Sequence, residues 1–440
     1  MTLPRHAGGS GTEPYLKTDI CIIGAGPAGL MAAIYAAGQG AQTALLETHA
    51  SVGRKLLATG GGRCNFTHAS TVDELVRTFG KNGRFLRHSL HTLSPEGIQA
   101  FLAERGLAGR VEADGCVFPV TDSAADVRDI LLREVEQRGV QILYRHQVTD
   151  VIAGPEGFTL GTSAAPVAAK RLIVATGGLS WPQTGSTGDG YRFASALGHT
   201  VVTPKASLVP LVTRERWPGT LAGVSLHCVK AWVASSGRKH AVGGPMVFTQ
   251  DGIGGPTALD LSRTLTDALA ASDDGVDVCL DLIPDVTEQD LDQRLQERFA
   301  AHPKKAVANI LADLTPKRLA ATLCAQVTND REFHANRVTR DMRRRLTGLL
   351  KALPLRITKT HPIAEATVTR GGVSIEEIDP RTLESRICPG LFFAGEVIDV
   401  DGPCGGYSLQ ACWSTGALAG LSAARSLDTD GATAGSLRNS

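Results

Sequence analysis

Two patterns of apolar and polar residues divide the chain. In the first, short apolar runs typical of buried strands alternate with stretches whose apolar residues recur every three or four positions, as in an amphipathic helix. The strand-like runs lie at 19–23, 43–46, 140–144, 147–152 and 170–174, and the clearest helical stretch lies at 124–138. Strands that alternate with helices predict an α/β fold with a parallel sheet.

The second pattern begins near residue 206. Strand-like segments follow at 225–234, 245–249 and 276–282, and residues 286–350 have helical spacing that prolines interrupt. The α/β pattern returns at 361, with strand-like segments at 365–373 and 387–400. We therefore predict a discontinuous α/β domain that carries two insertions: α/β segments at 18–205 and 355–428, a β-rich domain at 206–285, a helical domain at 286–354, and flexible tails at 1–17 and 429–440.

A glycine-rich turn follows the first strand. Gly24, Gly26 and Gly29 form G-x-G-x-x-G, and the second strand ends in an acid, Glu47. In this motif the glycines permit a tight turn, a close approach to a pyrophosphate and close packing of the helix on the sheet. Pro27 suits the first helical turn, and the helix N-terminus presents free N–H groups to phosphate. Glu47 favours an adenosine ribose with free hydroxyls.

Two other interpretations of this stretch compete. Residues 20–37 are apolar enough to resemble a membrane span, but a Gly-Pro turn interrupts them, and Asp19 and Glu47 bracket them. An α/β turn that binds nothing is the second alternative. The stretch by itself predicts a dinucleotide site and leaves both FAD and NAD open.

The segment after Glu47 combines basic residues with consecutive glycines. Arg54, Lys55 and Arg63 flank the glycine run 60–62. Consecutive glycines cost backbone entropy, so a close approach to a ligand is the expected reason for them. We interpret the segment as a loop over a flat or anionic ligand, with an arginine near phosphate or ring oxygens. A solvated surface loop is the alternative.

Two later strands also lead into glycine-rich turns. The strand at 170–174 leads into Gly177 and Gly178, and ligands of such sheets bind at the carboxyl ends of the strands. Glu396 could accept hydrogen bonds from a ribityl chain. A helix that begins after the run 401–410 would stabilise the negative charge of a reduced isoalloxazine. Val148 is a candidate for a backbone contact with adenine, and an ordinary sheet residue is the alternative.

Composition limits the functional classes. The chain has 440 residues and a net charge of +1, so a soluble globular enzyme of two or three domains is expected. Nine cysteines without a C-x-x-C pair indicate neither a disulfide framework nor a zinc site, and we expect no metal. The N-terminal residues lack the apolar core of a secretory signal, and we predict a cytoplasmic protein.

The run 337–345 is the densest basic stretch of the chain. An RNA or phosphate contact is one interpretation. A solvated helix face is the other, and the lack of interleaved aromatic residues favours it. We therefore do not expect a nucleic acid partner. The loop at 250–257 has glycines but no long preceding strand, and we predict a structural turn there that leads into a short helix.

Taken together, these segments resemble the HI0933-like (BaiN/YhiN) flavoproteins, a branch of the two-segment FAD-binding fold. GGGRCN and GEVxDxxGxxGGY are the specific motifs, whereas GxGxxG alone is not. The likeness covers residues 19–423, and the matching motifs are IIGAGPAG at 22–29, GRKLLATGGGRCN at 53–65, ATGG at 175–178, TGSTGDGY at 184–191, VTRGGV at 368–373 and FAGEVIDVDGPCGGYSLQ at 393–410.

The resemblance implies FAD bound by a Rossmann-type two-segment domain, with a β-barrel-like domain and a helical domain inserted. It assigns no catalytic acid or base. With the residues argued above, the predicted cofactor-binding set is Gly24, Gly26, Pro27, Ala28, Gly29, Glu47, Arg54, Lys55, Gly62, Arg63, Cys64, Asn65, Val148, Thr176, Gly177, Gly178, Gly395, Glu396, Asp399, Gly406, Tyr407, Ser408, Leu409 and Gln410.

The chain departs from the family at two motifs. Cys404 and Ser408 replace the Thr and Asn of the usual GPTGGYNLQ. Gln250 and Asp251 replace the His and Phe of FTHFGLSGP, which puts any substrate role of that histidine in doubt. Cys64 suggests thiol exchange with the flavin, with Cys404 as its partner, but a small packing cysteine is the commoner case.

We predict an FAD-dependent oxidoreductase that transfers hydride between NAD(P)H and a small organic substrate. NAD(P)H is expected to visit the flavin transiently, because no second dinucleotide fingerprint is evident. Three alternatives stay open: a flavin oxidase of a small amine that uses oxygen, an RNA-associated flavoprotein, and a redox sensor without turnover. We expect no membrane association, and a monomer or a homodimer.

Overall fold

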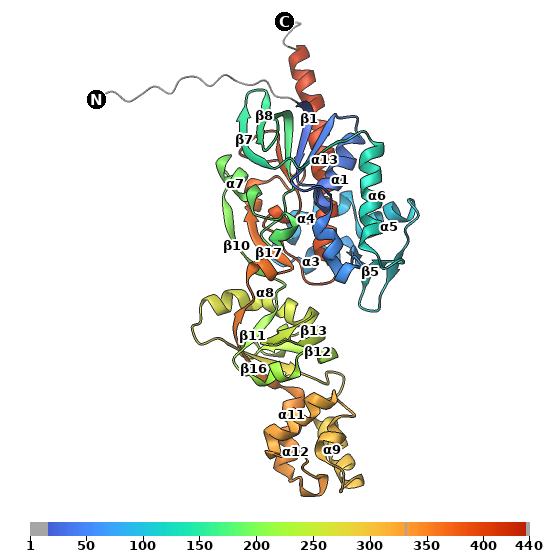
Figure 1. Ribbon diagram of the computed structural model, residues 1–440, viewed down its shortest axis with the longest axis vertical. Coiled ribbons are helices and arrows are strands. Elements are labelled where there is room, and N and C mark those ends of the chain that lie inside the picture. Colours follow the sequence, from blue (N-terminus) through green and yellow to red (C-terminus); the bar gives the residue numbers. More distant parts are fainter. Residues whose placement is uncertain (1–15, 331, 437–440) are drawn as a thin grey trace, which may run out of the picture. The chain divides into compact units, whose positions relative to one another are not determined.

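The computed structural model describes residues 16–330 and 332–436, which form two compact units (Figure 1). Unit 1 contains the described residues up to Pro204 together with those from Arg370, and unit 2 contains Lys205–Thr369. The chain leaves unit 1 along β10 (Val201–Ser207) and returns along β17 (Val368–Val373), and these two strands pair with each other. The predicted tail at 1–17 lies outside the described residues except for its last two.

A seven-stranded sheet forms the centre of unit 1, in the order β6-β2-β1-β9-β8-β7, with β18 also paired to β9. The pairs of β1 with β2 and β9, of β2 with β6 and of β9 with β18 are parallel, and β7, β8 and β9 pair antiparallel. This confirms the predicted α/β fold of the Rossmann type. The strands are β1 (Leu16–Ile23), β2 (Thr43–Glu47), β6 (Gln141–Tyr144), β7 (Val148–Gly154), β8 (Gly157–Thr162), β9 (Val167–Val174) and β18 (Leu391–Phe393).

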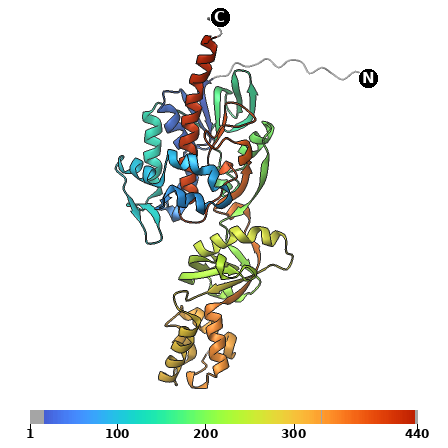
Figure 2. The same ribbon diagram turned by 180° about the vertical axis from the view of Figure 1, so that it is seen from behind.

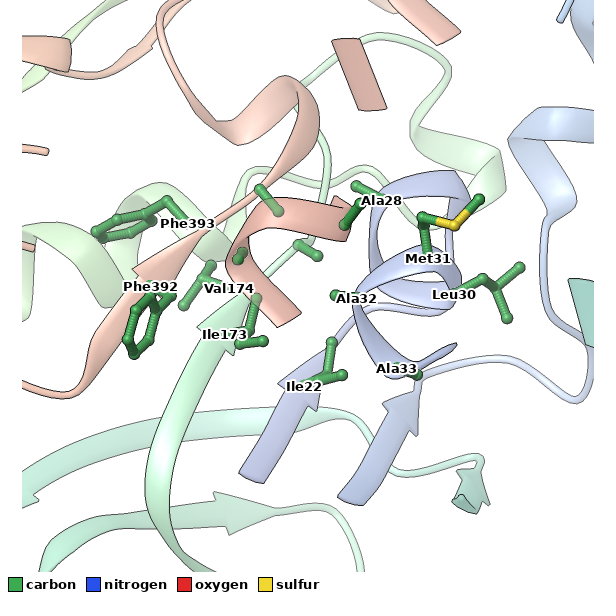
Figure 3. Close-up of a cluster of buried hydrophobic side chains, with 14 of the residues drawn as sticks. Ile22, Ala28, Leu30, Met31, Ala32, Ala33, Ile173, Val174, Phe392 and Phe393 are labelled. Atoms are coloured by element: carbon green, nitrogen blue, oxygen red, sulfur yellow. The ribbon is translucent and has the colours of Figure 1, made fainter. Parts of the chain in front are cut away.

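The core of unit 1 joins the two sequence segments of the discontinuous fold. Ile22, Ile173, Val174, Phe392 and Phe393 are fully buried on β1, β9 and β18 (Figure 3). The register sets Phe392 beside Ile173 and Phe393 beside Val174. The apolar run predicted at 387–400 therefore supplies a central strand, but the strand is only three residues long.

Helices α1 (Pro27–Ala37) and α13 (Tyr407–Ser436) pack closely because both are rich in small residues. A Cβ on Gly416 would lie 2.3 Å from the carbonyl oxygen of Ala28, and one on Gly420 would lie 2.3 Å from that of Ala32. Figure 2 shows α13 lying across unit 1. The helix continues to residue 436, into the predicted tail at 429–440, and no proline interrupts its sequence. Residues 437–440 of the predicted tail lie outside the described residues.

The remaining elements of unit 1 pack around this frame. They include a small antiparallel sheet in the order β3-β5-β4. Their bounds are α2 (Arg54–Ala58), β3 (Thr67–His68), α3 (Val72–Thr78), α4 (Gly83–Thr92), α5 (Pro95–Ala103), β4 (Gly109–Val111), β5 (Cys116–Pro119), α6 (Ala124–Gln137) and α7 (Asp189–Ala196).

Unit 2 consists of a closed antiparallel barrel in the order β11-β14-β13-β12-β15-β16, and of helices. None of the helices within 16–436 has the length and apolarity that a bilayer span requires. The elements are β11 (Leu211–Thr213), β12 (Ser225–Val233), β13 (Val242–Phe248), β14 (Gly252–Gly254), α8 (Pro256–Ala270), β15 (Val276–Asp281), α9 (Glu288–Ala301), α10 (Val307–Leu311), α11 (Lys317–Thr328), α12 (Arg340–Lys351) and β16 (Leu353–Thr360).

Candidate functional site

Four parallel strands of unit 1 end at the same edge of the sheet, and the predicted residues gather there. Gly24 follows β1, Glu47 ends β2, residues 176–178 follow β9, and Gly395 follows β18. The carboxyl edge of an open α/β sheet is where such folds bind ligands. The structure therefore brings together glycine-rich segments that lie more than 200 residues apart in the sequence.

Gly24 and Gly29 are required by the close packing of the first turn. Gly24 has a left-handed φ of 100°, and a Cβ there would lie 2.6 Å from the carbonyl oxygen of Ala175. A Cβ on Gly29 would lie 1.8 Å from the carbonyl oxygen of Gly24. No larger side chain fits either position without moving backbone, so the turn and the start of α1 form a fixed unit.

Gly26 differs, because space beside it is open. No atom lies within 4 Å of the Cβ position of Gly26, although it directly precedes α1. No side chain caps the helix, whose first residues are Pro27 and Ala28. An uncapped helix N-terminus beside open space offers N–H groups and a partial positive charge to an anion.

The carboxylate of Glu47 is held by backbone donors beside this turn. Its two oxygens accept hydrogen bonds from the N–H of Ala25 at 3.1 Å and of His49 at 2.8 Å. The N–H of His146 donates to the backbone carbonyl of Glu47 at 2.9 Å, which places Val148, two residues later, close to this end of the site. The two backbone donors fix the position of the Glu47 carboxylate beside the first glycine turn.

A hydrogen-bonded triad joins three of the glycine-rich segments. The ammonium group of Lys55 donates to Glu396 Oε2 at 2.6 Å and to Ser180 Oγ at 2.7 Å, and Ser180 Oγ donates to Glu396 Oε1 at 2.9 Å. Lys55 and Glu396 are among the residues predicted from the sequence, whereas Ser180 is not. The signal was its position two residues after the ATGG motif.

The loop at 60–62 exposes its backbone. All three glycines have left-handed φ values, of 56°, 67° and 90°, and no atom lies within 4 Å of a Cβ on Gly61. Arg54, before the loop, is exposed, whereas the guanidinium of Arg63 lies over the Phe118 ring and pairs with Glu112 at 2.9 Å. The loop therefore presents open backbone, and its second arginine already has partners.

Cys64 and Asn65 turn toward the protein. The side chain of Cys64 is fully buried, and burial raises the pKa of its thiol to about 12. A thiol in that state is protonated at neutral pH and is a poor nucleophile, which argues against the exchange suggested by the sequence. Asn65 Oδ1 accepts a hydrogen bond from the Val117 N–H at 3.3 Å. These two residues hold the shape of the loop.

The N-terminus of α13 also lies in unit 1. Gly406 precedes the helix with a φ of 88°, and a Cβ there would lie 2.4 Å from the Thr67 carbonyl oxygen. The ring of Tyr407 stacks on His68, with 4.7 Å between ring centroids. Ser408 Oγ is buried and has no hydrogen-bond partner among the described residues.

Two further predicted residues of α13 face inward. Leu409 and Gln410 are buried. The Gln410 amide accepts from Thr67 Oγ1 at 2.5 Å and donates to Ser414 Oγ at 2.9 Å and to the Leu93 carbonyl at 2.8 Å. The amide therefore ties α13 to its neighbours, and its polar atoms are already bonded.

Two buried hydroxyls lack hydrogen-bond partners in the described part of the chain, and one of them lies near two carboxylates. Within the described residues, Thr176 Oγ1 and Tyr191 Oη are buried and lack hydrogen bonds. Tyr191 is close enough to Glu396 and Asp399 for their charges to raise its pKa, although burial is the larger cause. Burial also raises the pKa of Asp399, whose Oδ1 accepts from the Gly371 N–H at 3.0 Å. Sequence reasoning missed Tyr191, although the quoted TGSTGDGY motif ends on it.

These features fit an adenine dinucleotide with a flavin. The open Cβ positions at Gly26 and Gly61 would let a ligand approach the backbone closely. The Ser408 and Thr176 hydroxyls, which have no partner among the described residues, could donate hydrogen bonds to a ligand rich in acceptors. Gly177, with a φ of 76°, and Gly178 line the same sheet edge after β9. Within 16–330 and 332–436, no group of His, Cys, Asp and Glu residues has the arrangement of a metal site.

Known proteins are similar in sequence to this chain over nearly its whole length. The family model "HI0933-like protein Rossmann domain" matches residues 18–422. A ribosomal RNA dihydrouridine synthase of Escherichia coli (strain K12) is 33% identical over 91% of this chain and 96% of its own length. A 3-dehydro-bile acid Δ(4,6)-reductase of Clostridium scindens is 31% identical over 92% of this chain and 98% of its own length.

Solved structures share the fold at low identity. A 3-ketosteroid-Δ4-(5α)-dehydrogenase from Rhodococcus jostii RHA1 has a TM-score of 0.52 at 18% identity, covering 94% of this chain and 98% of its own. A 3-ketosteroid Δ1-dehydrogenase from Sterolibacterium denitrificans has a TM-score of 0.53 at 13% identity, covering 93% of this chain and 100% of its own. At such identities the likeness concerns the fold alone.

Proposed function

This chain belongs to the HI0933-like family and is an FAD-dependent oxidoreductase, and on this premise we propose that it reduces a carbon–carbon double bond conjugated with a carbonyl group. The observation that carries the proposal is the reaction that the names of two full-length relatives share. A dihydrouridine synthase adds two hydrogens to a uracil ring, and a 3-dehydro-bile acid Δ(4,6)-reductase reduces double bonds in a steroid that bears a ketone.

The overall reaction balances with one reduced nicotinamide. NAD(P)H, one proton and the unsaturated substrate give NAD(P)⁺ and a product with two more hydrogens. Bound FAD would supply the hydride chemistry that couples oxidation of the nicotinamide to reduction of the substrate. NAD(P)H is the donor we propose. Because a single glycine fingerprint of the dinucleotide type follows a strand within the described residues, we expect the nicotinamide to visit the flavin transiently.

The protein's own residues would bind and orient the cofactor. Gly26 and the uncapped start of α1 receive the pyrophosphate, and Glu47 receives the adenosine ribose. The N-terminus of α13, with the unpartnered Ser408 hydroxyl, would hold the flavin and would favour its reduced, negatively charged form. The triad of Lys55, Ser180 and Glu396 fixes the loops between these two ends.

Two substrate classes follow from the relatives. Uridine in ribosomal RNA comes first, because relatives with that name are 33% and 32% identical to this chain. A small conjugated ketone comes second, from the bile acid reductase at 31%. The expectation that nucleic acid is not a partner is therefore not confirmed.

The test measures the product. Holoenzyme is incubated anaerobically with NADH or NADPH and with ribosomal RNA transcribed in vitro, and the digested nucleosides are analysed by mass spectrometry. A parallel reaction contains a steroid dienone. The proposal predicts that one acceptor gains two hydrogens as one nicotinamide is oxidised. If neither acceptor is reduced, and an amine instead bleaches the flavin that oxygen then restores, the enzyme is an amine oxidase and the proposal is wrong.

A further inference from the structure

Positive charge is concentrated in one part of unit 2. Residues 286–351 contain 13 Lys and Arg against 8 Asp and Glu, a net charge of +5. The rest of the chain contains 32 against 36, a net charge of −4. The near-zero total of +1 therefore hides a strongly basic helical segment beside an acidic remainder.

Within this segment, α12 separates its arginines into two groups. Arg343 points toward α9 and forms a two-pronged ion pair with Asp292, with Nε–Oδ1 and Nη2–Oδ2 distances of 2.9 Å each. Leu346 and Leu350 of the same helix are fully buried. This side of α12 is its packing face, and Arg343 is already neutralised by a structural partner.

The other group is exposed. Arg340, Arg344 and Arg345 lie on the exposed side of α12, and no carboxylate within 4 Å pairs with them in the described part of the chain. Arg340 and Arg344 are one helical turn apart, about 6 Å along the axis. Asp341 is also exposed on this side, so the helix contributes a net charge of +2 here.

Arg337 extends the surface just before the helix. It is exposed, and its guanidinium lies 4.5 Å from the centroid of the buried Phe333 ring. This contact restrains the arginine against the ring, which lowers the entropy lost when it binds a ligand. We call Arg337, Arg340, Arg344 and Arg345 the α12 arginine face; Figure 1 shows α12 in unit 2.

We propose that the α12 arginine face binds the phosphate backbone of an RNA substrate. The proposal rests on the proposed function, since it supplies the docking surface for the RNA in which the reduced ring lies. Guanidinium groups spaced along one helix side suit a row of phosphates. The face has no exposed aromatic ring, so it holds RNA without reading its sequence. Selection of the reacting base is left to the site in unit 1.

The test measures the salt dependence of RNA binding. FAD-loaded enzyme is titrated against a fluorescent fragment of ribosomal RNA at about 50 to 300 mM salt. Over this range the Debye length shortens, so the screening of exposed charges increases. The triple variant R340Q/R344Q/R345Q is compared with a control that loses the same charge from exposed arginines of unit 1, R77Q/R133Q/R425Q. Circular dichroism melting shows whether both variants remain folded.

The face predicts a specific change. Each lost phosphate contact reduces the slope of log K against log salt by about 0.7–0.9, so the triple variant loses roughly two units of slope and about tenfold or more in affinity near 100 mM salt. The control keeps the wild-type slope. Replacement of the same arginines by lysine retains most of the binding, because charge is the main requirement. Equal slopes in the triple variant and the control would overturn the proposal.

Two further outcomes separate this inference from the proposed function. Dihydrouridine formation with equal KM for RNA in wild type and triple variant would leave the proposed function intact and remove the role of α12. Binding that depends on the face, without reduction of RNA, would keep the face and remove RNA as substrate. Poly-glutamate is also tested as a competitor of the labelled RNA. If it displaces the RNA as well as unlabelled RNA of equal total charge does, the face binds an acidic protein partner and the RNA assignment is overturned.

Discussion

Gly26→Ala tests the pyrophosphate site most cleanly. The Cβ position has no atom within 4 Å, and the backbone φ of −79° suits any residue, so the methyl group fits the protein without FAD. The methyl would occupy the space in which we propose that the pyrophosphate binds, and overfilling a packed contact costs about 1–3 kcal/mol. That range corresponds to roughly fivefold to 150-fold weaker FAD binding. The dissociation constant is measured from flavin fluorescence as apoprotein is titrated with FAD.

The melting temperature of the apoprotein supplies the second measurement. We expect Gly26→Ala to change the stability of the apoprotein by less than about 1 kcal/mol, because it alters only a helix cap. Gly29→Ala is the contrasting variant, since its Cβ would lie 1.8 Å from the Gly24 carbonyl oxygen and must displace α1. It should destabilise the apoprotein itself. Unchanged FAD affinity in Gly26→Ala would refute the placement of the pyrophosphate.

Three other predictions follow from single contacts. Glu47→Gln should weaken FAD binding about tenfold, because an amide replaces one oxygen of a carboxylate held by two backbone donors; an unchanged dissociation constant would contradict this. Cys64→Ser should keep turnover and bound FAD, because burial raises the pKa of the thiol to about 12; loss of turnover with FAD retained would restore the redox hypothesis. In the wild type the Lys351 ammonium lies 2.7 Å from the buried Asp281 carboxylate. Lys351→Met removes this ion-pair partner and should lower the free energy of unfolding, measured in urea, by about 3–5 kcal/mol. Adding Asp281→Asn should recover most of that loss, and an equal loss in the double variant would mean that packing explains it.

The sequence predicted the fold because its strongest signals are local. The apolar runs at 19–23, 43–46 and 170–174 became the central strands, and glycines at their ends marked the turns. The strand predicted within 387–400 was harder to delimit. Neighbouring segments also bury apolar residues outside β18, whose three residues alone pair with β9. The loop at 250–257 was expected to lead into a short helix. It contains β14 of the barrel and leads into α8, which has 15 residues, and barrel pairing is a non-local property that no local pattern reveals.

The site was predictable in its backbone and less so in its side chains. Glycine positions follow from turn geometry, but the partner of a charged side chain depends on which segments meet. Arg63 is predicted near a ligand, and the structure adds two partners that the sequence does not reveal, the Glu112 carboxylate and the Phe118 ring. The Lys55–Glu396 contact joins residues that are 341 positions apart. The place of Ser180 after ATGG marks it as a site residue, but its hydrogen bonds to Lys55 and Glu396 follow only from the fold.

One anaerobic experiment tests the central claim most directly. The enzyme is reduced with one equivalent of NADH or NADPH under argon, and a conjugated acceptor, ribosomal RNA or a steroid dienone, is then added. The account predicts that the oxidised flavin spectrum returns without oxygen, with one double bond lost for each flavin reoxidised. A reduced flavin that persists with every such acceptor, and is reoxidised only by air, would contradict it.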